Sequence, residues 1–99
     1  MSTEIDMTKK AIYDKIESQI TAVQAKLETL KAKAERAKAN AELKVIADLL
    51  TKKQVIDHRL SELKKSGETT YQQAKTDVES RIAELDKSVK AIEAKLKGA

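Results

Sequence analysis

Apolar side chains recur along the first part of this chain at the alternating three- and four-residue steps of an amphipathic helix. The run comprises Tyr13, Ile16, Ile20, Val23, Leu27 and Leu30, and it continues as alanine at Ala34, Ala37 and Ala41. Such a heptad pattern predicts a seam of buried positions that packs against other helices. The change from large residues to alanine toward Ala41 indicates that a partner helix approaches closely there.

A second apolar run begins further along the chain and is out of phase with the first. It comprises Ile46, Leu49, Lys53, Ile56, Leu60 and Leu63. The step from Ala41 to Ile46 is five residues, whereas a continuous heptad seam requires three or four. Two structures account for this shift. Either the chain turns back near residues 38–42 and forms a three-helix bundle, or one continuous helix changes the face that it buries.

Local helix propensity favours the continuous helix. Residues 33–42 contain no glycine or proline and are nearly all strong helix formers, with Asn40 the one mildly unfavourable residue. A tight turn there would need special backbone dihedral angles without the residues that best supply them. We therefore predict a first helix over about residues 9–65, roughly 85 Å long at about 1.5 Å per residue. The three-helix bundle is the alternative.

The first of the two glycines lies in the stretch that separates this helix from the next. Gly67 can adopt the left-handed conformation that closes a last helical turn. Thr69-x-x-Gln72 then has the form of a capping box, which marks the start of a helix. The second helix is predicted over about residues 69–97, with its seam at Tyr71, Lys75, Val78, Ile82, Leu85, Val89, Ile92 and Leu96.

The composition supports an all-α fold in a single domain over residues 1–99. Proline is absent, aromatic residues make up 2% of the chain and charged residues 36%. No segment alternates apolar and polar residues with the period of a strand. A composition rich in Ala, Glu, Lys and Leu with helical periodicity is typical of long helices and coiled coils. Because the loop is short, the two predicted helices form an antiparallel hairpin or coiled coil.

The predicted helices differ in length, and this mismatch implies a partner. The second helix covers only about half of the first, which leaves the seam from Tyr13 to Ala37 without a neighbour. A long exposed apolar stripe is not tolerated on a soluble monomer. We therefore predict a homodimer of antiparallel long helices, together with an unidentified protein partner. The self-association surface would comprise Tyr13, Ile16, Ile20, Val23, Leu27 and Leu30.

The charge pattern offers a second, less favoured interaction. The net charge is +4, from 20 basic and 16 acidic residues that are interspersed, which is typical of solvated helix faces with local ion pairs. One basic run could bind the phosphates of nucleic acid or an anionic membrane surface; it comprises Lys31, Lys33, Arg36 and Lys38. Acidic residues interrupt this run, and few aromatic residues are present for base stacking. We expect protein partners rather than nucleic acid or membrane.

No residue pattern in the chain indicates catalysis. Cysteine is absent, and the only histidine, His58, lies opposite the seam, where a solvated surface position is expected. Glu-x-x-His pairs and glycine-rich phosphate loops are also absent. We therefore predict a non-enzymatic protein without catalytic residues, cofactor or metal. The first residues lack a signal-peptide pattern and no window is apolar enough to span a membrane, so we expect a cytoplasmic protein.

Several short motifs resemble those of a known family. They are Tyr13–Lys15, the block LKAKAERAKA at residues 30–39, Leu60-x-x-Leu63, Ser66-Gly67-Glu68, and the segment from Tyr71 to Leu85 that includes Lys75 and Val78-Glu79-Ser80. With these, nearly the whole chain resembles a family of small bacterial coiled-coil stress-response proteins. Family members carry Trp where this chain has Tyr71 and Ile82. The resemblance implies a helical, non-enzymatic protein linked to stress, and it supplies no catalytic residues.

Overall fold

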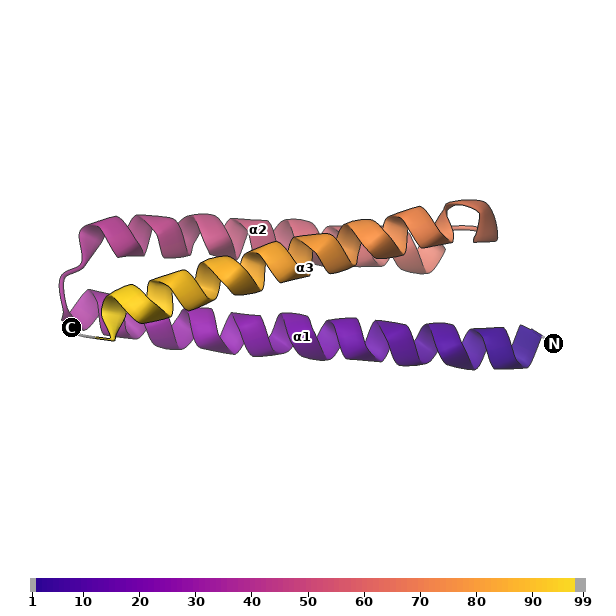
Figure 1. The fold of residues 1–99 in the computed structure, drawn as a ribbon, viewed down its shortest axis with the longest axis horizontal. Coiled ribbons are helices and arrows are strands. Elements are labelled where there is room, and N and C mark those ends of the chain that lie inside the picture. Colours follow the sequence, from indigo (N-terminus) through magenta and orange to yellow (C-terminus); the bar gives the residue numbers. More distant parts are fainter. Residues whose placement is uncertain (1, 98–99) are drawn as a thin grey trace.

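Three helices, each antiparallel to the one before it, form an elongated bundle in the computed structural model, which describes residues 2–97 and the side chains of residues 9–67 and 69–97 (Figure 1). The helices are α1 (Ser2–Arg36), α2 (Asn40–Lys65) and α3 (Glu68–Leu96). The bundle measures 55 × 18 × 16 Å. All regular structure in residues 2–97 is helical, as predicted. The continuous helix over residues 9–65 is wrong, and the alternative, a three-helix bundle, is the observed fold.

The chain turns back at Ala37–Ala39, which we call the hinge. The amide N–H of Ala39 donates to the carbonyl of Ala34 (2.9 Å), and that of Lys38 donates to the carbonyl of Glu35 (3.2 Å). These two hydrogen bonds are those of a Schellman motif, the usual way in which an α-helix is closed. Lys38, the first residue beyond the helix in this motif, has a positive φ of 57°. Glycine commonly occupies this position, and lysine occupies it here.

The hinge forms despite its helix-forming sequence because packing outweighs local propensity. A left-handed conformation costs a residue other than glycine roughly 1–2 kcal/mol. Folding back buries the seams of α1 and α2 within one chain, and each fully buried Leu, Ile or Val side chain contributes about 1.5–3 kcal/mol. The five-residue step between Ala41 and Ile46 was therefore the sign of a turn.

The second turn differs in detail from its prediction. Gly67 has φ −79° and ψ 173°, an extended conformation that any residue can adopt, so the left-handed glycine is wrong. Gly67 is the N-cap of α3, and its carbonyl accepts the amide N–H of Tyr71 at 3.0 Å. Helix α3 begins one residue before Thr69, and its N-terminus has no side-chain cap hydrogen bond. The end of the preceding helix is closed by the Ser66 hydroxyl, which donates to the Leu63 carbonyl at 2.7 Å.

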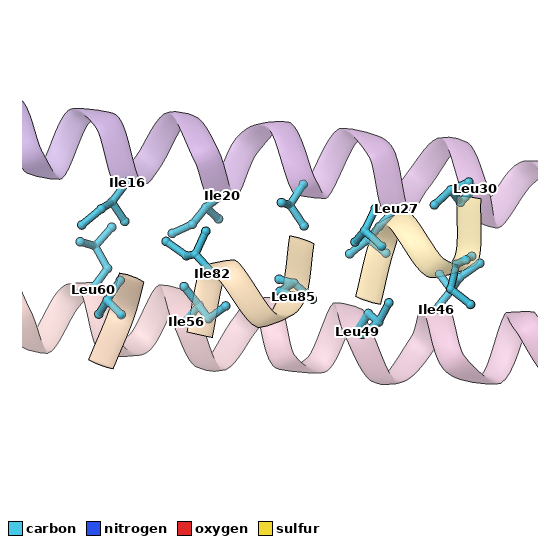
Figure 2. Close-up of a cluster of buried hydrophobic side chains, with 14 of the residues drawn as sticks. Ile16, Ile20, Leu27, Leu30, Ile46, Leu49, Ile56, Leu60, Ile82 and Leu85 are labelled. Carbon is cyan, nitrogen blue, oxygen red and sulfur yellow. The ribbon is translucent and has the colours of Figure 1, made fainter. Parts of the chain in front are cut away.

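The three seams meet in one continuous core along the bundle axis. Figure 2 shows Ile16 and Leu30 of α1 pointing toward α2, and Leu60 and Ile46 of α2 pointing toward α1. The buried positions follow the predicted seams closely: Ile16, Ile20, Val23, Leu27, Leu30, Ala34, Ile46, Leu49, Ile56, Leu60, Leu63, Tyr71, Val78, Ile82, Leu85, Val89, Ile92 and Leu96. The seam positions were predicted correctly except at Ala37 and Ala41, which are exposed because the chain turns there and no helix packs against them. The connection between the first two seams was also wrong.

Candidate interaction surfaces

The predicted self-association surface lies inside the bundle of a single chain. Five of its six members are buried and the sixth, Tyr13, is half-buried against them; the buried five are Ile16, Ile20, Val23, Leu27 and Leu30. The expectation that this seam is uncovered is wrong, because α2 and α3 of the same chain cover it. The seam can meet a second copy only if α1 separates from α2 and α3.

The hinge is the locally strained point of the backbone. Lys38 is the one residue other than glycine with a positive φ in residues 2–97. The helix that follows begins without a favourable cap, since its N-cap is Ala39 and no side chain accepts a hydrogen bond there. A strained residue and an uncapped helix are therefore adjacent in the chain.

Two tyrosines pack together at the end of the bundle opposite the hinge. The rings of Tyr13 and Tyr71 meet edge to face with their centroids 6.5 Å apart. The ammonium group of Lys9 lies 4.7 Å from the centre of the Tyr71 ring, and that of Lys64 lies 5.9 Å from the centre of the Tyr13 ring. Lys64 is also ion-paired with Glu17 of α1. This cluster therefore joins α1 to α2 and α3 at the end where α1 begins.

The hydroxyl of Tyr71 is buried and has no hydrogen-bond partner among the described residues. The side chain is only 7% exposed. Burial raises the pKa of this phenol above its ordinary value, and the neighbouring Tyr13 and Glu79 raise it further. A buried hydroxyl without a hydrogen bond lowers the free energy of unfolding, so the Tyr71 hydroxyl destabilises an otherwise apolar core.

A shallow groove of about 460 Å³ runs between α1 and α3. Its apolar floor includes Ile16, Val23 and Ile82, with the small side chains of Ala22 and Ala83 beside them. Its charged lining is mixed in sign, and comprises Lys15, Lys26, Lys75, Glu79 and Asp86. The mixture gives the groove no preference for an anionic or a cationic ligand.

The predicted anion-binding residues lie at one end of the bundle. Lys31, Lys33 and Arg36 belong to the last turns of α1, and Lys38 belongs to the hinge. All are exposed except Lys33, which is half-buried. The fold places four more lysines at this end, from the start of α2 and from the end of α3 and its C-cap: Lys44, Lys90, Lys95 and Lys97. The hinge and the second turn, between α2 and α3, together bring them to the same end.

The lone histidine is on the surface, as predicted. The His58 side chain is 76% exposed, and its Nε2 lies 3.9 Å from Glu62 Oε1. Within the described residues, no three or more His, Asp or Glu side chains are grouped so that they could hold a metal ion. None of the three helices, as far as the chain is described, is long and apolar enough to cross a membrane.

No family model, curated protein or solved structure matches this chain. The resemblance to the stress-response family therefore stays a prediction from the short motifs given above. The features that bear on function are physical ones: a strained hinge between two helices and an uneven distribution of charge along the bundle.

Proposed function

We propose that this protein is a non-enzymatic helical interaction module that acts by exchanging α1 between chains. In the exchange the hinge straightens, α1 and α2 become one continuous helix, and α1 packs against α2 and α3 of a second copy. The product is a homodimer of antiparallel long helices. The observation that carries the proposal is the left-handed Lys38 within a sequence that otherwise favours helix.

Straightening the hinge relieves a cost that exists only in the closed bundle. The left-handed conformation of Lys38 costs roughly 1–2 kcal/mol. A continuous helix also removes the uncapped N-terminus of α2, where a favourable cap is worth about 1 kcal/mol. Alanine and lysine are among the best helix formers, so residues 37–39 lose little when they become helical. Short hinges under strain are known to favour domain swapping.

Outside the hinge, the exchange conserves the contacts of the core. Each α1 meets the same surfaces of α2 and α3 on its partner that it meets within its own chain, as in any domain swap. The balance between the two forms therefore depends on the hinge and on the freedom lost when two chains associate, roughly 4–15 kcal/mol at a 1 M standard state. We expect closed monomers at low protein concentration and swapped dimers at high concentration.

The same mechanism accommodates a different protein as partner. Any amphipathic helix with a matching heptad seam can occupy the place of α1 on α2 and α3. Heat and other conditions that loosen the closed bundle increase the population in which α1 is released. This dependence supports the link to stress that the family resemblance implies. The stress link is tested by measuring the abundance of the protein in its native cell before and after heat shock.

A cross-linking trap distinguishes the two forms. The chain has no cysteine, so Glu17→Cys and Lys64→Cys can be introduced together at a pair of long side chains that are in contact between α1 and α2. A short bis-maleimide bridges the two thiols across the space that these long side chains fill. In the closed monomer the cross-link forms within one chain, whereas in the swapped dimer it joins two chains. The protein is incubated at a series of concentrations, diluted, cross-linked at once and separated on a denaturing gel. Each single-cysteine variant reports the background of random collisions.

We expect the covalent dimer to increase with the concentration during incubation, and to exceed that of both single-cysteine variants. Swapped dimers persist through brief dilution because their separation requires α1 to unpack. A cross-link that forms only within one chain at every concentration would overturn the proposal. A noncovalent dimer that never gives a covalent link between chains would also overturn it, since its copies would associate without exchanging α1.

A further inference from the structure

The net charge of the molecule is concentrated at one end of the bundle. Figure 1 shows that α3 ends beside the hinge, so the last turns of α1, the first turn of α2 and the last turns of α3 lie together. We call the side chains of residues 28–44 and 90–97 the basic end. Its eight basic residues are Lys31, Lys33, Arg36, Lys38, Lys44, Lys90, Lys95 and Lys97, and its four acidic residues are Glu28, Glu35, Glu42 and Glu93.

The rest of the chain is electrically balanced. Outside the basic end, twelve basic residues face twelve acidic ones, so the whole net charge of +4 belongs to the basic end. Basic and acidic residues are interspersed along the sequence, but in the folded chain the net positive charge lies at one end. The polarity arises because residues 28–44 and 90–97, which are distant in sequence, meet at one end of a bundle only 18 × 16 Å across.

The positive charges of the basic end are also poorly compensated by ion pairs. Among the described residues, Lys90 is the one basic member with such a partner, Asp86, at 3.1 Å. One acidic member, Glu93, is itself partnered at 3.8 Å by Lys26, which lies outside the basic end. Elsewhere on the bundle, ion pairs involve Lys26, Lys52, Lys53, Arg59, Lys64 and Arg81.

Helix dipoles explain only part of this arrangement. Lys33 and Arg36 lie in the last turn of α1, and Lys95 lies in the last turn of α3, where positive charge is stabilising. Lys38 directly precedes the N-terminus of α2, where the macrodipole disfavours positive charge. Lys44 lies beyond the first turn of that helix and gains nothing from a C-terminal dipole. The basic end therefore carries more positive charge than the helix dipoles account for.

We propose that the basic end binds the phosphate backbone of duplex nucleic acid without sequence preference. Lysine predominates there, and an ammonium group contacts phosphate as a point charge, whereas arginine forms the bidentate contacts that read bases. Aromatic side chains for stacking on unpaired bases are also missing from the basic end, because Tyr13 and Tyr71, the chain's two aromatic residues, lie in the early turns of α1 and α3 at the opposite end. The chemistry therefore fits contacts to the backbone of a duplex.

The same features favour duplex nucleic acid over an anionic membrane. Helices that lie on membranes insert bulky apolar side chains beside their basic residues. In the described part of the chain, the exposed large apolar residues are two separate valines on α2, Val45 and Val55. Without an apolar anchor, affinity depends on the charge density of the partner. Duplex DNA carries one negative charge per about 1.7 Å of its axis and releases condensed counterions when it is neutralised.

The test compares two triple variants that remove the same charge from different places. Lys31→Gln, Lys44→Gln and Lys95→Gln neutralise one exposed lysine of the basic end on each helix. The matched control, Lys10→Gln, Lys52→Gln and Lys87→Gln, neutralises one exposed lysine on each helix outside the basic end. Binding to a labelled 24-base-pair DNA duplex is measured by fluorescence anisotropy between about 20 and 200 mM salt, the range in which counterion release dominates.

We expect the wild-type protein to bind with a slope of log Kobs against log salt of about −3 to −4, as for three or four phosphate contacts. The basic-end variant should lose more than about tenfold in affinity at low salt and most of that slope, roughly one unit per lysine. The control variant should match the wild type, and circular dichroism should show unchanged helicity in both.

Three results would overturn the proposal. The first is an absence of salt-sensitive binding by the wild type, and the second is an equal loss of affinity in the two triple variants, which would indicate diffuse attraction. The third is tighter binding to phosphatidylserine vesicles than to the duplex at the same salt, which would assign the surface to membranes. None of the substituted residues lies in the hinge, so a failure of this proposal is distinguishable from a failure of the exchange of α1, which the hinge variants test.

Discussion

Replacing Lys38 by glycine tests the role of the hinge most directly. Lys38 has φ 57°, in the left-handed region that glycine adopts without steric cost. The substitution therefore relieves strain in the closed bundle. Glycine is also a poor helix former, so the same substitution destabilises the continuous helix that the swapped dimer requires. Both effects favour the monomer.

The magnitude follows from these two effects. Relief of the left-handed strain favours the closed chain by about 1 kcal/mol. Glycine in place of lysine inside a helix disfavours the open chain by about a further 1 kcal/mol. The dimer contains two hinges, so its free energy of formation changes by roughly 4 kcal/mol, which raises its dissociation constant by about 10³-fold. Glycine also gives the unfolded chain greater conformational freedom. This effect does not change the dissociation constant, because monomer and dimer are both folded.

Sedimentation equilibrium over a wide range of protein concentration measures this shift. Lys38→Ala is the matched control, since alanine keeps the left-handed strain and forms helix at least as well as lysine. We expect Lys38→Ala to dimerise as readily as the wild type, and Lys38→Gly to remain monomeric at concentrations where both others dimerise. Equal dissociation constants for the glycine and alanine variants would refute the reasoning, because they would show that the hinge conformation does not control association.

Three further substitutions test the bundle itself. Gly67→Asp places a good N-cap at an extended position with open space around it. We expect about 1 kcal/mol of stabilisation, seen by calorimetry as a higher melting temperature. A lower melting temperature would show that glycine is needed at this position. Tyr71→Phe removes the unpaired buried hydroxyl and should stabilise the bundle. The pKa of Tyr71 is raised above 10.0, so the folded wild type keeps its proton while the unfolded chain releases it, and stability falls as the pH rises past 10. Urea titrations between pH 9 and 11 should show a smaller loss for Tyr71→Phe than for Tyr13→Phe. Leu27→Ala opens a cavity at a fully buried position and should cost about 2–5 kcal/mol of unfolding free energy in urea, whereas a small effect would contradict the observed core.

The sequence predicted the seams better than it predicted the path of the chain between them. Burial at positions such as Ile20 and Ile56 follows from local periodicity, which identifies the apolar face of a helix that must pack against another element. It does not report which segment supplies that cover. The hinge was missed because residues 37–39 favour helix locally, and because its left-handed position is filled by a lysine. Packing of α1 against α2 and α3 decides the outcome, and no local property of residues 37–39 records those contacts.

The interaction surfaces were predicted incompletely for the same reason. The run from Lys31 to Lys38 is visible in the sequence, but acidic neighbours make it appear compensated. Lys44 follows the run closely in sequence, whereas Lys95 joins it only through the antiparallel course of α3. The self-association residues were identified as a seam in need of cover, and the structure supplies that cover within one chain.

The hinge and the basic end lie at the same place, which couples the two proposals. In the proposed swapped dimer both hinges would lie near the centre of the long helices, so two basic ends of net charge +4 each would come side by side. Their repulsion opposes dimer formation at low ionic strength, because the Debye length is about 30 Å in 0.01 M salt. In 0.1 M salt the Debye length falls to about 10 Å, and the repulsion is largely screened. Dimerisation should therefore strengthen as salt is raised, which is opposite to the salt dependence expected for binding duplex DNA. Sedimentation at 20 and 300 mM salt distinguishes the two, and a dimer that weakens with salt would exclude the swapped arrangement, because it would require attraction between the chains at the centre.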